Sequence, residues 1–422
     1  MIGTQDRRPR SLGRFPAAVT AFVILVASAA PAAAAPGDLD PSFGDDGHAS
    51  VPFRYGGAAA LDLHDDGSIV TAGTSGYRGQ HITVVRMTEY GALDATFGGD
   101  GVVRPAFLGD AWGSAVAVAD DGSVIAVGSI GKRVAVARFL EDGSPDEGFS
   151  GDGRLSFRSG ASRWTGIDVA ALPGGNVLVA AEVRRPGDAM VGLLSILPDG
   201  SFDPGFDGDG RTRFLLGPPK RVHGVSVAVD DGRVFAAFGK PHGIGLVGWQ
   251  LNGEVDPTVG VDGVAKLPVE GVGRVIDVEV DLAGRPLIST VSFSDDVFPF
   301  GSGLIRALPE GTLDSTWSDD GFASPGAPLS GMTGIAVQDD GKVVVSGLEC
   351  CGAGSGEAAW VVARFDTSGD LDDTFGTEGV VASNDFSESG ARDVAVQPDG
   401  KLVVTGSAGF FYGFAVRRYL VE

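Results

Sequence analysis

A nine-residue motif, Leu-Asp-x-x-Phe-Gly-x-Asp-Gly, recurs seven times along the 422-residue chain. Its copies begin near residues 39, 93, 144, 202, 255, 313 and 371, and the third copy is degenerate. Consecutive copies place their first aspartates 52 to 58 residues apart, at Asp40, Asp94, Asp146, Asp203, Asp256, Asp314 and Asp372. Such a period indicates stacked supersecondary units that bury apolar surface against their neighbours. The Leu and Phe of the motif are therefore interpreted as packing residues between units.

Each unit also contains an alternating apolar segment with a tight turn in its middle, as in residues 115–128 around Asp121-Gly122. Period-two alternation on both sides of such a turn predicts an antiparallel hairpin. A third apolar strand, such as residues 134–139, leads into the motif, and a short strand, such as residues 101–104, follows it. Four short strands in a meander are the content of one propeller blade. With 67 glycines and few helix-forming runs, the chain is predicted to be all-β.

On these segments the units resemble the delta-60 repeat family of bacterial β-propellers, and residues 334–347 are also similar to an NHL-type blade. The resemblance covers about residues 38–422 and implies a seven-bladed β-propeller with four antiparallel strands per blade. The NHL comparison implies that the strand before the Asp-Gly turn lies innermost. The chain would then end on a third strand at residues 414–419, and the N-terminal strand near residues 48–53 would join the last blade. This closure leaves neither edge unpaired.

Three local departures from the pattern make the regularity of some blades uncertain. Gly174-Gly175 and Ala283-Gly284 stand where other units have Asp-Gly, and the motif copy near residue 144 is eroded. Blades three and five are therefore expected to be the least regular. The fold itself does not depend on these positions.

Residues 1–35 have the composition of a secretory signal peptide, because arginines precede an apolar stretch and an Ala-rich segment. Residues 36–422 are predicted to form the propeller, secreted and without a membrane span. A net charge of −23 opposes binding to nucleic acid. The two cysteines, Cys350 and Cys351, are adjacent, so no long-range disulfide can form within the chain, and the pair is either reduced or a vicinal disulfide.

Runs such as residues 207–210, Asp-Gly-Asp-Gly, resemble fragments of calcium-binding loops. The full twelve-residue loop with its terminal Glu is absent, and Asp-Gly is also what a tight turn requires. We interpret these runs as turns and predict no cofactor and no metal ligands, with calcium as the alternative.

A four-stranded meander places its connections on two opposite faces of the ring. The turns between strands one and two and between strands three and four share one face, and they are uniform and acidic. The other connections vary in length and define what we call the variable face, where binding tends to reside. Basic residues beside aromatic ones on this face suit anionic glycans or acidic peptide segments. The candidate ligand-binding residues are Arg78, Trp112, Arg163, Trp164, Arg184, Arg185, Arg221 and His223.

An alternative interpretation is that Trp112 and Trp164 only cap the blades by packing. No catalytic constellation is visible, because the five histidines never fall at His-x-x-x-His spacing and no Gly-x-Ser-x-Gly motif occurs. We therefore predict a non-catalytic scaffold that binds an extracellular protein or glycan. Two alternatives stay open: a propeller enzyme such as a polysaccharide lyase or hydrolase, with His81, His223 and His242 as first candidates, and a calcium-stabilised envelope protein.

Overall fold

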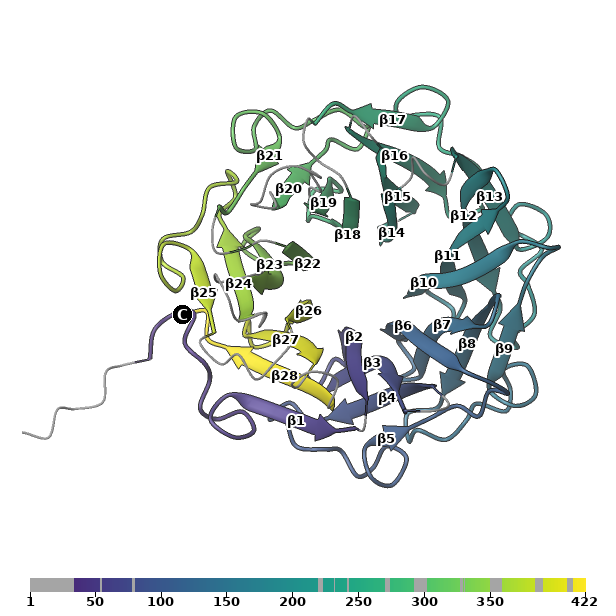
Figure 1. The fold of residues 1–422 in the computed structure, drawn as a ribbon, viewed down its shortest axis with the longest axis horizontal. Helices are drawn as coiled ribbons and strands as arrows, with labels where there is room; N and C mark the ends of the chain where they lie inside the picture. Colours follow the sequence, from purple (N-terminus) through teal and green to yellow (C-terminus); the bar gives the residue numbers. More distant parts are fainter. Residues whose placement is uncertain are drawn as a thin grey trace, which may run out of the picture. The chain divides into compact units, whose positions relative to one another are not determined.

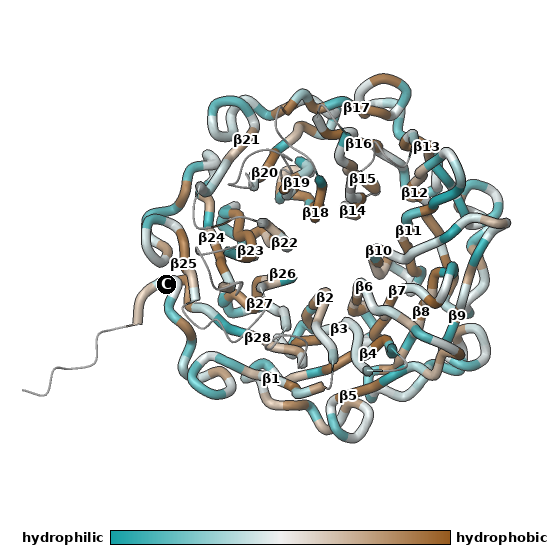
Figure 2. The backbone as a smooth tube through the Cα atoms, viewed as in Figure 1, coloured by the Kyte–Doolittle hydropathy of each residue, from teal (hydrophilic) through white to brown (hydrophobic). Residues whose placement is uncertain are grey.

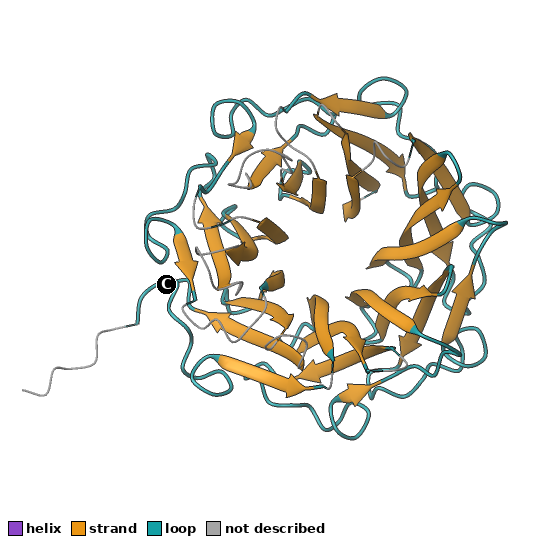
Figure 3. Cartoon of the chain, in the orientation of Figure 1, coloured by secondary structure: helices purple, strands orange, loops and turns teal. Residues whose placement is uncertain are grey.

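Seven four-stranded antiparallel sheets surround a central axis in the computed structural model of the chain (Figure 1). In six sheets the strands follow chain order outward from the axis, and the seventh takes its outermost strand from the N-terminal part. The described residues contain strands and turns but no helix, and thus no helix able to cross a membrane (Figure 3). The predicted fold is confirmed.

The structure describes residues 34–422 with the exception of several short segments. The segments left out are 54, 78–79, 219–222, 231, 241–242, 270–273, 292–301, 327–328, 330, 350–358, 384–389 and 408–412. For His223 and Asp230 the structure describes the backbone but not the side chain. The cysteine pair and nearly all of the predicted signal peptide therefore lie outside the described residues, and the described residues from Ala35 onward belong to one compact unit.

The four strands of a blade occupy the same four positions in every sheet, and blade 1 consists of β2 to β5. The innermost strands are β2 (Gly56–Leu63), β6 (Ala111–Val118), β10 (Arg163–Ala171), β14 (His223–Asp230), β18 (Arg274–Val280), β22 (Gly331–Val337) and β26 (Ala391–Val396). The second strands are β3 (Ile69–Ser75), β7 (Val124–Ile130), β11 (Val177–Arg185), β15 (Arg233–Lys240), β19 (Pro286–Val291), β23 (Val343–Glu349) and β27 (Leu402–Ser407).

The third strands are the most deeply buried along their whole length. They are β4 (His81–Met87), β8 (Arg133–Phe139), β12 (Asp188–Ile196), β16 (Gly243–Gln250), β20 (Ser302–Arg306), β24 (Ala359–Phe365) and β28 (Gly413–Tyr419). The outermost strands are β5 (Val102–Val103), β9 (Arg154–Phe157), β13 (Arg211–Gly217), β17 (Val264–Leu267), β21 (Phe322–Ala323), β25 (Val380–Ala382) and β1 (His48–Pro52). Apolar residues concentrate on the strands, and polar residues concentrate on the connections at the outside of the ring (Figure 2).

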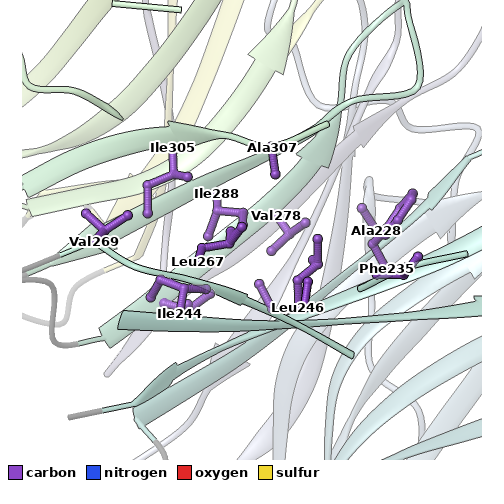
Figure 4. Close-up of a cluster of buried hydrophobic side chains, with 14 residues drawn as sticks. Ala228, Phe235, Ile244, Leu246, Leu267, Val269, Val278, Ile288, Ile305 and Ala307 are labelled. Atoms are coloured by element: carbon purple, nitrogen blue, oxygen red, sulfur yellow. The ribbon is translucent and has the colours of Figure 1, made fainter. Parts of the chain in front are cut away.

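Seven apolar clusters fill the seams between neighbouring blades. The cluster between blades 4 and 5, for example, joins Ile244 and Leu246 of β16 to Val278 and Ile288 of the next blade (Figure 4). Every cluster contains the aromatic residue of one motif copy or its replacement, exposed by no more than 1%: Phe43, Phe97, Phe149, Phe206, Val259, Trp317 and Phe375. Since burying one such side chain stabilises by about 1.5–3 kcal/mol, the motif holds adjacent blades together as the repeat predicts.

An arginine at the end of the third strand adds a polar clip over several of these seams. In blade 1, Nε of Arg86 lies 2.7 Å from Oδ2 of Asp94, and Nη2 donates to Oγ1 of Thr96 at 2.8 Å. Its Nη1 donates to the backbone oxygen of Glu141 in blade 2, and the guanidinium lies over the ring of Phe97. Equivalent arginines pair with the motif aspartate in four other blades: Arg138, Arg306, Arg364 and Arg418.

Blade 7 is built from both ends of the described chain. Strand β1 pairs with β28 in antiparallel register, from His48 opposite Arg417 to Pro52 opposite Gly413. Ahead of β1, Asp40 forms an ion pair with Arg418, in which Oδ2 of Asp40 lies 2.9 Å from Nη2 of Arg418. The closure predicted from the sequence is confirmed, and it replaces a covalent link between the first and last units.

Blades 3 and 5, which the sequence marks as the least regular, have the same strand order as the others. In blade 3 both Gly174 and Gly175 adopt positive φ, 85° and 83°, which an Asp-Gly pair cannot supply at its first position without strain. The turn still closes, because Leu172 N donates to the backbone oxygen of Asn176 at 2.8 Å. A different turn therefore joins the same two strands.

We expect Arg86→Ala to lower the free energy of unfolding by about 1.5–3 kcal/mol, because it removes charge-assisted hydrogen bonds to Asp94 and to the backbone oxygen of Glu141 in a partly buried seam. The control is Arg185→Ala, which breaks an exposed ion pair with Asp188 and should cost less than about 1 kcal/mol. Urea unfolding followed by tryptophan fluorescence measures both. Equal losses would show that the clip contributes no more than a surface ion pair.

Candidate functional site

A groove of about 910 Å³ opens on the variable face over blade 2. Its walls are residues 106–110, which lead from blade 1 into blade 2, the hairpin tip between β7 and β8, the strand β9 and the start of β10. This volume lies within the range of about 300–1,000 Å³ that is typical of ligand sites. Blade 2, the connection that leads into it and the start of blade 3 therefore contribute to one concave surface.

The apolar part of the groove comes from the segment that enters blade 2. Trp112 at the start of β6 is 51% exposed, and Leu108 is 96% exposed. The segment is held in place because Oδ1 of Asp110 accepts the N–H of Gln80 at 3.1 Å and Ala111 N donates to the oxygen of Gln80 at 2.9 Å. A large indole held on a fixed backbone offers a flat stacking surface to a ligand.

The rest of the groove is basic. Lys132 and Arg133 stand at the tip of the β7–β8 hairpin, where Gly131 supplies the positive φ of the turn. Trp164 N donates to the backbone oxygen of Lys132 at 3.1 Å, which brings Arg163 beside this tip. The ion pairs of the described residues do not include Lys132, Arg133, Arg163 or Arg158, the fourth exposed cation of the groove.

A second hollow of about 620 Å³ lies at the outer rim between blades 1 and 2, lined by Val103, Pro105, Phe139 and Pro145 among others. In the degenerate motif copy, Pro145 bridges to Phe139 where other copies place a longer side chain, for example Leu371 against Phe365. We attribute the hollow to this shorter residue. The two hollows share the residues Ala106, Asp152 and Arg154 in their linings.

Apart from Trp164, the ligand-binding residues predicted from the sequence fall into three groups in the structure. Trp112 and Arg163 line the groove. Arg184 and Arg185 are on the neighbouring hairpin, paired with Glu182 at 2.6 Å and with Asp188 at 2.8 Å, and do not line it. The others are Arg78 and Arg221, which lie outside the described residues, and His223, of which only the β14 backbone is described.

Trp164 is corrected from a ligand-binding residue to a packing residue. It is 1% exposed within the cluster between blades 2 and 3, in edge-to-face contact with Phe157, and its Nε1 donates to the oxygen of Ser159 at 3.3 Å. A side chain with no accessible face cannot stack on a ligand. For Trp164, the structure agrees with the alternative interpretation that the side chain only packs against its blades.

Sequence reasoning missed Leu108, Arg154 and Arg158 as groove residues. Arg154 directly follows the Gly-Asp-Gly end of the eroded motif copy, so it looks like part of the repeat rather than of a site. Its Nη2 lies 2.7 Å from Oδ2 of Asp152, and its Nη1 donates to the backbone oxygen of Ala106. The degenerate motif copy near residue 144 was the one feature of the sequence that could have drawn attention to Arg154.

Ionisable side chains also gather in the central channel, a space of about 600 Å³ lined by the innermost strands. Four aspartates there, Asp62, Asp168, Asp277 and Asp393, accept backbone N–H groups of the next blade. The donors are Val118 to Asp62 at 2.8 Å, Ile335 to Asp277 at 3.0 Å, Leu61 to Asp393 at 2.9 Å, and Val227 to Asp168. The aspartates thus link neighbouring blades at the axis.

Confinement in the channel raises the pKa values of these carboxyl groups. Burial raises the pKa of Asp277 to about 6 from the ordinary 3.8, against the hydrogen bonds that lower it. Burial and the negative charge of Asp277 raise the pKa of Asp168 and of Asp393 well above the ordinary value. Burial likewise lowers the pKa of Arg392, which lines the same channel region.

The acidic turns do not assemble into a metal site within the part of the chain that the structure describes, where no group of three or more His, Cys, Asp or Glu is placed to hold an ion. The turn aspartates instead accept backbone N–H groups two residues later, as Asp100 does from Val102 at 3.0 Å and Asp121 from Ser123 at 3.0 Å. These contacts are the Asx turns that stabilise tight bends.

The fold and the groove define the chain as a β-propeller repeat protein with a concave, basic surface on its variable face. Two stretches, residues 119–149 and 338–375, match a family described as a domain of unknown function (DUF5122) beta-propeller. Both run from the turn after an innermost strand to the motif aromatic, Phe149 in one and Phe375 in the other. No curated protein matches the chain in sequence.

Several solved structures are similar in fold. The polysaccharide lyase Uly1 is 12% identical over 86% of this chain and 90% of its own, with a TM-score of 0.51. YCF48 bound to D1 peptide is 11% identical, with 92% and 98% covered and a TM-score of 0.48. The PQQ-bound aldose sugar dehydrogenase of Streptomyces coelicolor is 15% identical, with 72% and 94% covered and a TM-score of 0.42. Likeness at these identities shows the fold alone.

Stability should peak in mildly acidic solution, because two sets of carboxyl groups act in opposite directions. A raised pKa stabilises the fold below the folded value, so the contribution of Asp277 is lost as pH rises from 3.8 through about 6. A carboxyl group with a lowered pKa stabilises the fold above its unfolded pKa, and this contribution is lost as pH falls. Burial raises the pKa of Asp40, but hydrogen bonds from Ser42 and the charge of Arg418 outweigh it and lower the value to about 2, so that contribution is lost as pH falls below 3.8.

We therefore expect the thermal unfolding midpoint to be higher at about pH 5 than at about pH 7.5 or pH 3. Asp277→Asn should make the decline above pH 5 shallower, whereas the charge-matched exposed variant Asp339→Asn should leave its slope unchanged. Differential scanning calorimetry across the range measures both slopes. Identical slopes in the two variants would exclude Asp277 as the titrating group.

Proposed function

We propose that the chain is a secreted, non-catalytic propeller of the delta-60 repeat type that binds a protein or glycan in the groove over blade 2. The composition of residues 1–35 supports export. One observation carries the binding proposal. Four exposed cations, none of which forms an ion pair among the residues that the structure describes, line the same groove as an exposed tryptophan in a chain whose net charge is −23.

Placing these cations close together raises the free energy of the unbound protein, and an anionic or polar ligand would offset that rise. Like charges at one hairpin tip, Lys132 and Arg133, repel each other, and Arg163 lies beside the same tip. A long arginine side chain gains charge-assisted hydrogen bonds when an anionic or polar ligand arrives, and the indole of Trp112 gains a stacking partner. The rigid seams below the groove keep this arrangement ready for binding.

In a screen of glycan and peptide arrays with the purified chain, we expect binding that Trp112→Ala and Arg163→Ala each weaken by about tenfold, the equivalent of about 1.4 kcal/mol. Both residues are exposed, so the thermal midpoint should stay nearly unchanged. Lys266→Ala removes an exposed cation from β17 of blade 4, outside the groove, and serves as the control. Equal binding by all three variants would disprove the groove as the site.

A second candidate function is a glycan-cleaving enzyme that uses the channel. It is favoured by the raised pKa of Asp277, because a carboxyl group with a pKa of about 6 is protonated in mildly acidic solution and can act there as a general acid. Any glycan that binds should be incubated with the chain and its reducing ends counted. Turnover that is lost in Asp277→Asn while binding persists would establish the enzyme and replace the non-catalytic proposal.

A further inference from the structure

The groove and the outer hollow adjoin, because Ala106, Asp152 and Arg154 belong to the linings of both. Both are lined by Asp152 and Arg154, which therefore mark where the two hollows meet. From this junction, one arm runs over blade 2 past Trp112, and the other runs to the outer rim beside Pro145. An extended site crossing the seam between two blades fits a segment of a polymer better than it fits a compact small molecule.

Cations occur along both arms. The exposed Arg104 lines the outer hollow, Arg154 lies at the junction, and Arg158 and Arg163 line the groove with the hairpin tip. A ligand with a single anionic group would meet only one part of this series. A polymer with regularly repeated anionic groups would meet all of it.

The remaining side chains favour a sugar polymer over an acidic peptide. Asp110 and Asp152 stand among the cations, and their negative charge opposes the anionic groups of a polyacidic peptide and of an anionic polysaccharide alike. Their carboxylate oxygens can accept hydrogen bonds from the hydroxyl groups of a sugar, which such a peptide lacks. Trp112 presents a flat apolar face 51% exposed, on which the C–H face of a sugar ring can stack.

We infer that the groove and the outer hollow together bind an internal stretch of an anionic polysaccharide, with its carboxylate or sulfate groups on the arginines and one sugar ring on Trp112. The inference rests on the proposed function, because it names the ligand class of the same groove. Guanidinium groups pair with both anions in bidentate geometry, so the shared chemistry is a repeated oxyanion on a hydroxylated polymer.

The test uses the full chain and immobilised polymers of known composition. Polygalacturonate and alginate carry carboxylates, dextran sulfate carries sulfates, methyl-esterified pectin and dextran are their neutral counterparts, and poly-glutamate is the peptide arm. We expect an anionic glycan to bind at least about tenfold more tightly than its neutral counterpart and than poly-glutamate, with affinity falling as salt is added. The two anionic arms decide between carboxylate and sulfate.

Matched variants localise the binding. Arg158→Ala and Arg133→Ala should each weaken binding of the anionic polymer by about tenfold, and Lys266→Ala should not. Affinity should also rise with the length of defined oligosaccharides until both arms are filled, since short oligomers reach only one of them.

The outcomes separate the two proposals. Binding that depends on Trp112 but is equal for neutral and anionic glycans overturns the anionic class and leaves the binding groove standing. Stronger Trp112-dependent binding of poly-glutamate overturns the polysaccharide and assigns the groove to an acidic peptide. No Trp112-dependent binding of any polymer or array member overturns both the inference and the proposed function.

Discussion

Lateral packing between blades is the interaction on which the rest of the molecule depends. A single four-stranded blade has two apolar faces and cannot cover either of them alone, so it needs a neighbour on each side. The motif places one large side chain in every seam, such as Phe97 or Trp317, and in five blades an arginine lies over or beside it. Because this unit is local and repeated, seven copies suffice to close a ring with no covalent link across it.

Closure places different demands on the rim and on the axis. At the rim, Asp40 and Arg418 join the two ends of the chain by an ion pair whose carboxylate is stabilised in its charged form. At the axis, Asp277 and its neighbours link blades by accepting backbone N–H groups, but they lie close enough in one channel to disfavour each other's charge. At the rim, Asp40 has a lowered pKa and stabilises the ring most when it is ionised. At the axis, Asp277 has a raised pKa because burial disfavours its charged form. The four channel aspartates that form these links belong to blades 1, 3, 5 and 7.

The sequence predicted the fold closely because the information is local and redundant. The Asp-Gly turns and the alternating segments defined the hairpins, the motif defined the seams, and the last strand at residues 414–419 required the N-terminal strand as its partner. The site was predicted less well. Face assignment placed Trp112 and Arg163 on the variable face, where both line the groove. Alternation alone could not show that Trp164, one residue further along β10, points into the seam. Nor could it show that Arg184 and Arg185 already have carboxylate partners, which depends on the register of β11 with its neighbours.

The outer hollow lies beside the eroded copy of the motif in blade 2, which gives this irregularity a structural meaning. A ring of identical seams would present seven equivalent rims, none suited to one ligand. In blade 2 the motif copy has lost its leucine to Pro145, which leaves the hollow beside Phe139, while Phe149 of the same copy remains buried and keeps the seam intact. In blade 4, by contrast, Gly248 replaces the clip arginine and Val259 replaces the aromatic residue, and a Cβ at Gly248 would lie 2.5 Å from Val259, so the two changes are coupled and the seam stays filled. Loss of an outer side chain opens a surface, whereas paired changes in the seam preserve packing. Sequence divergence at the rim can therefore create a binding site without disturbing the interaction that closes the ring.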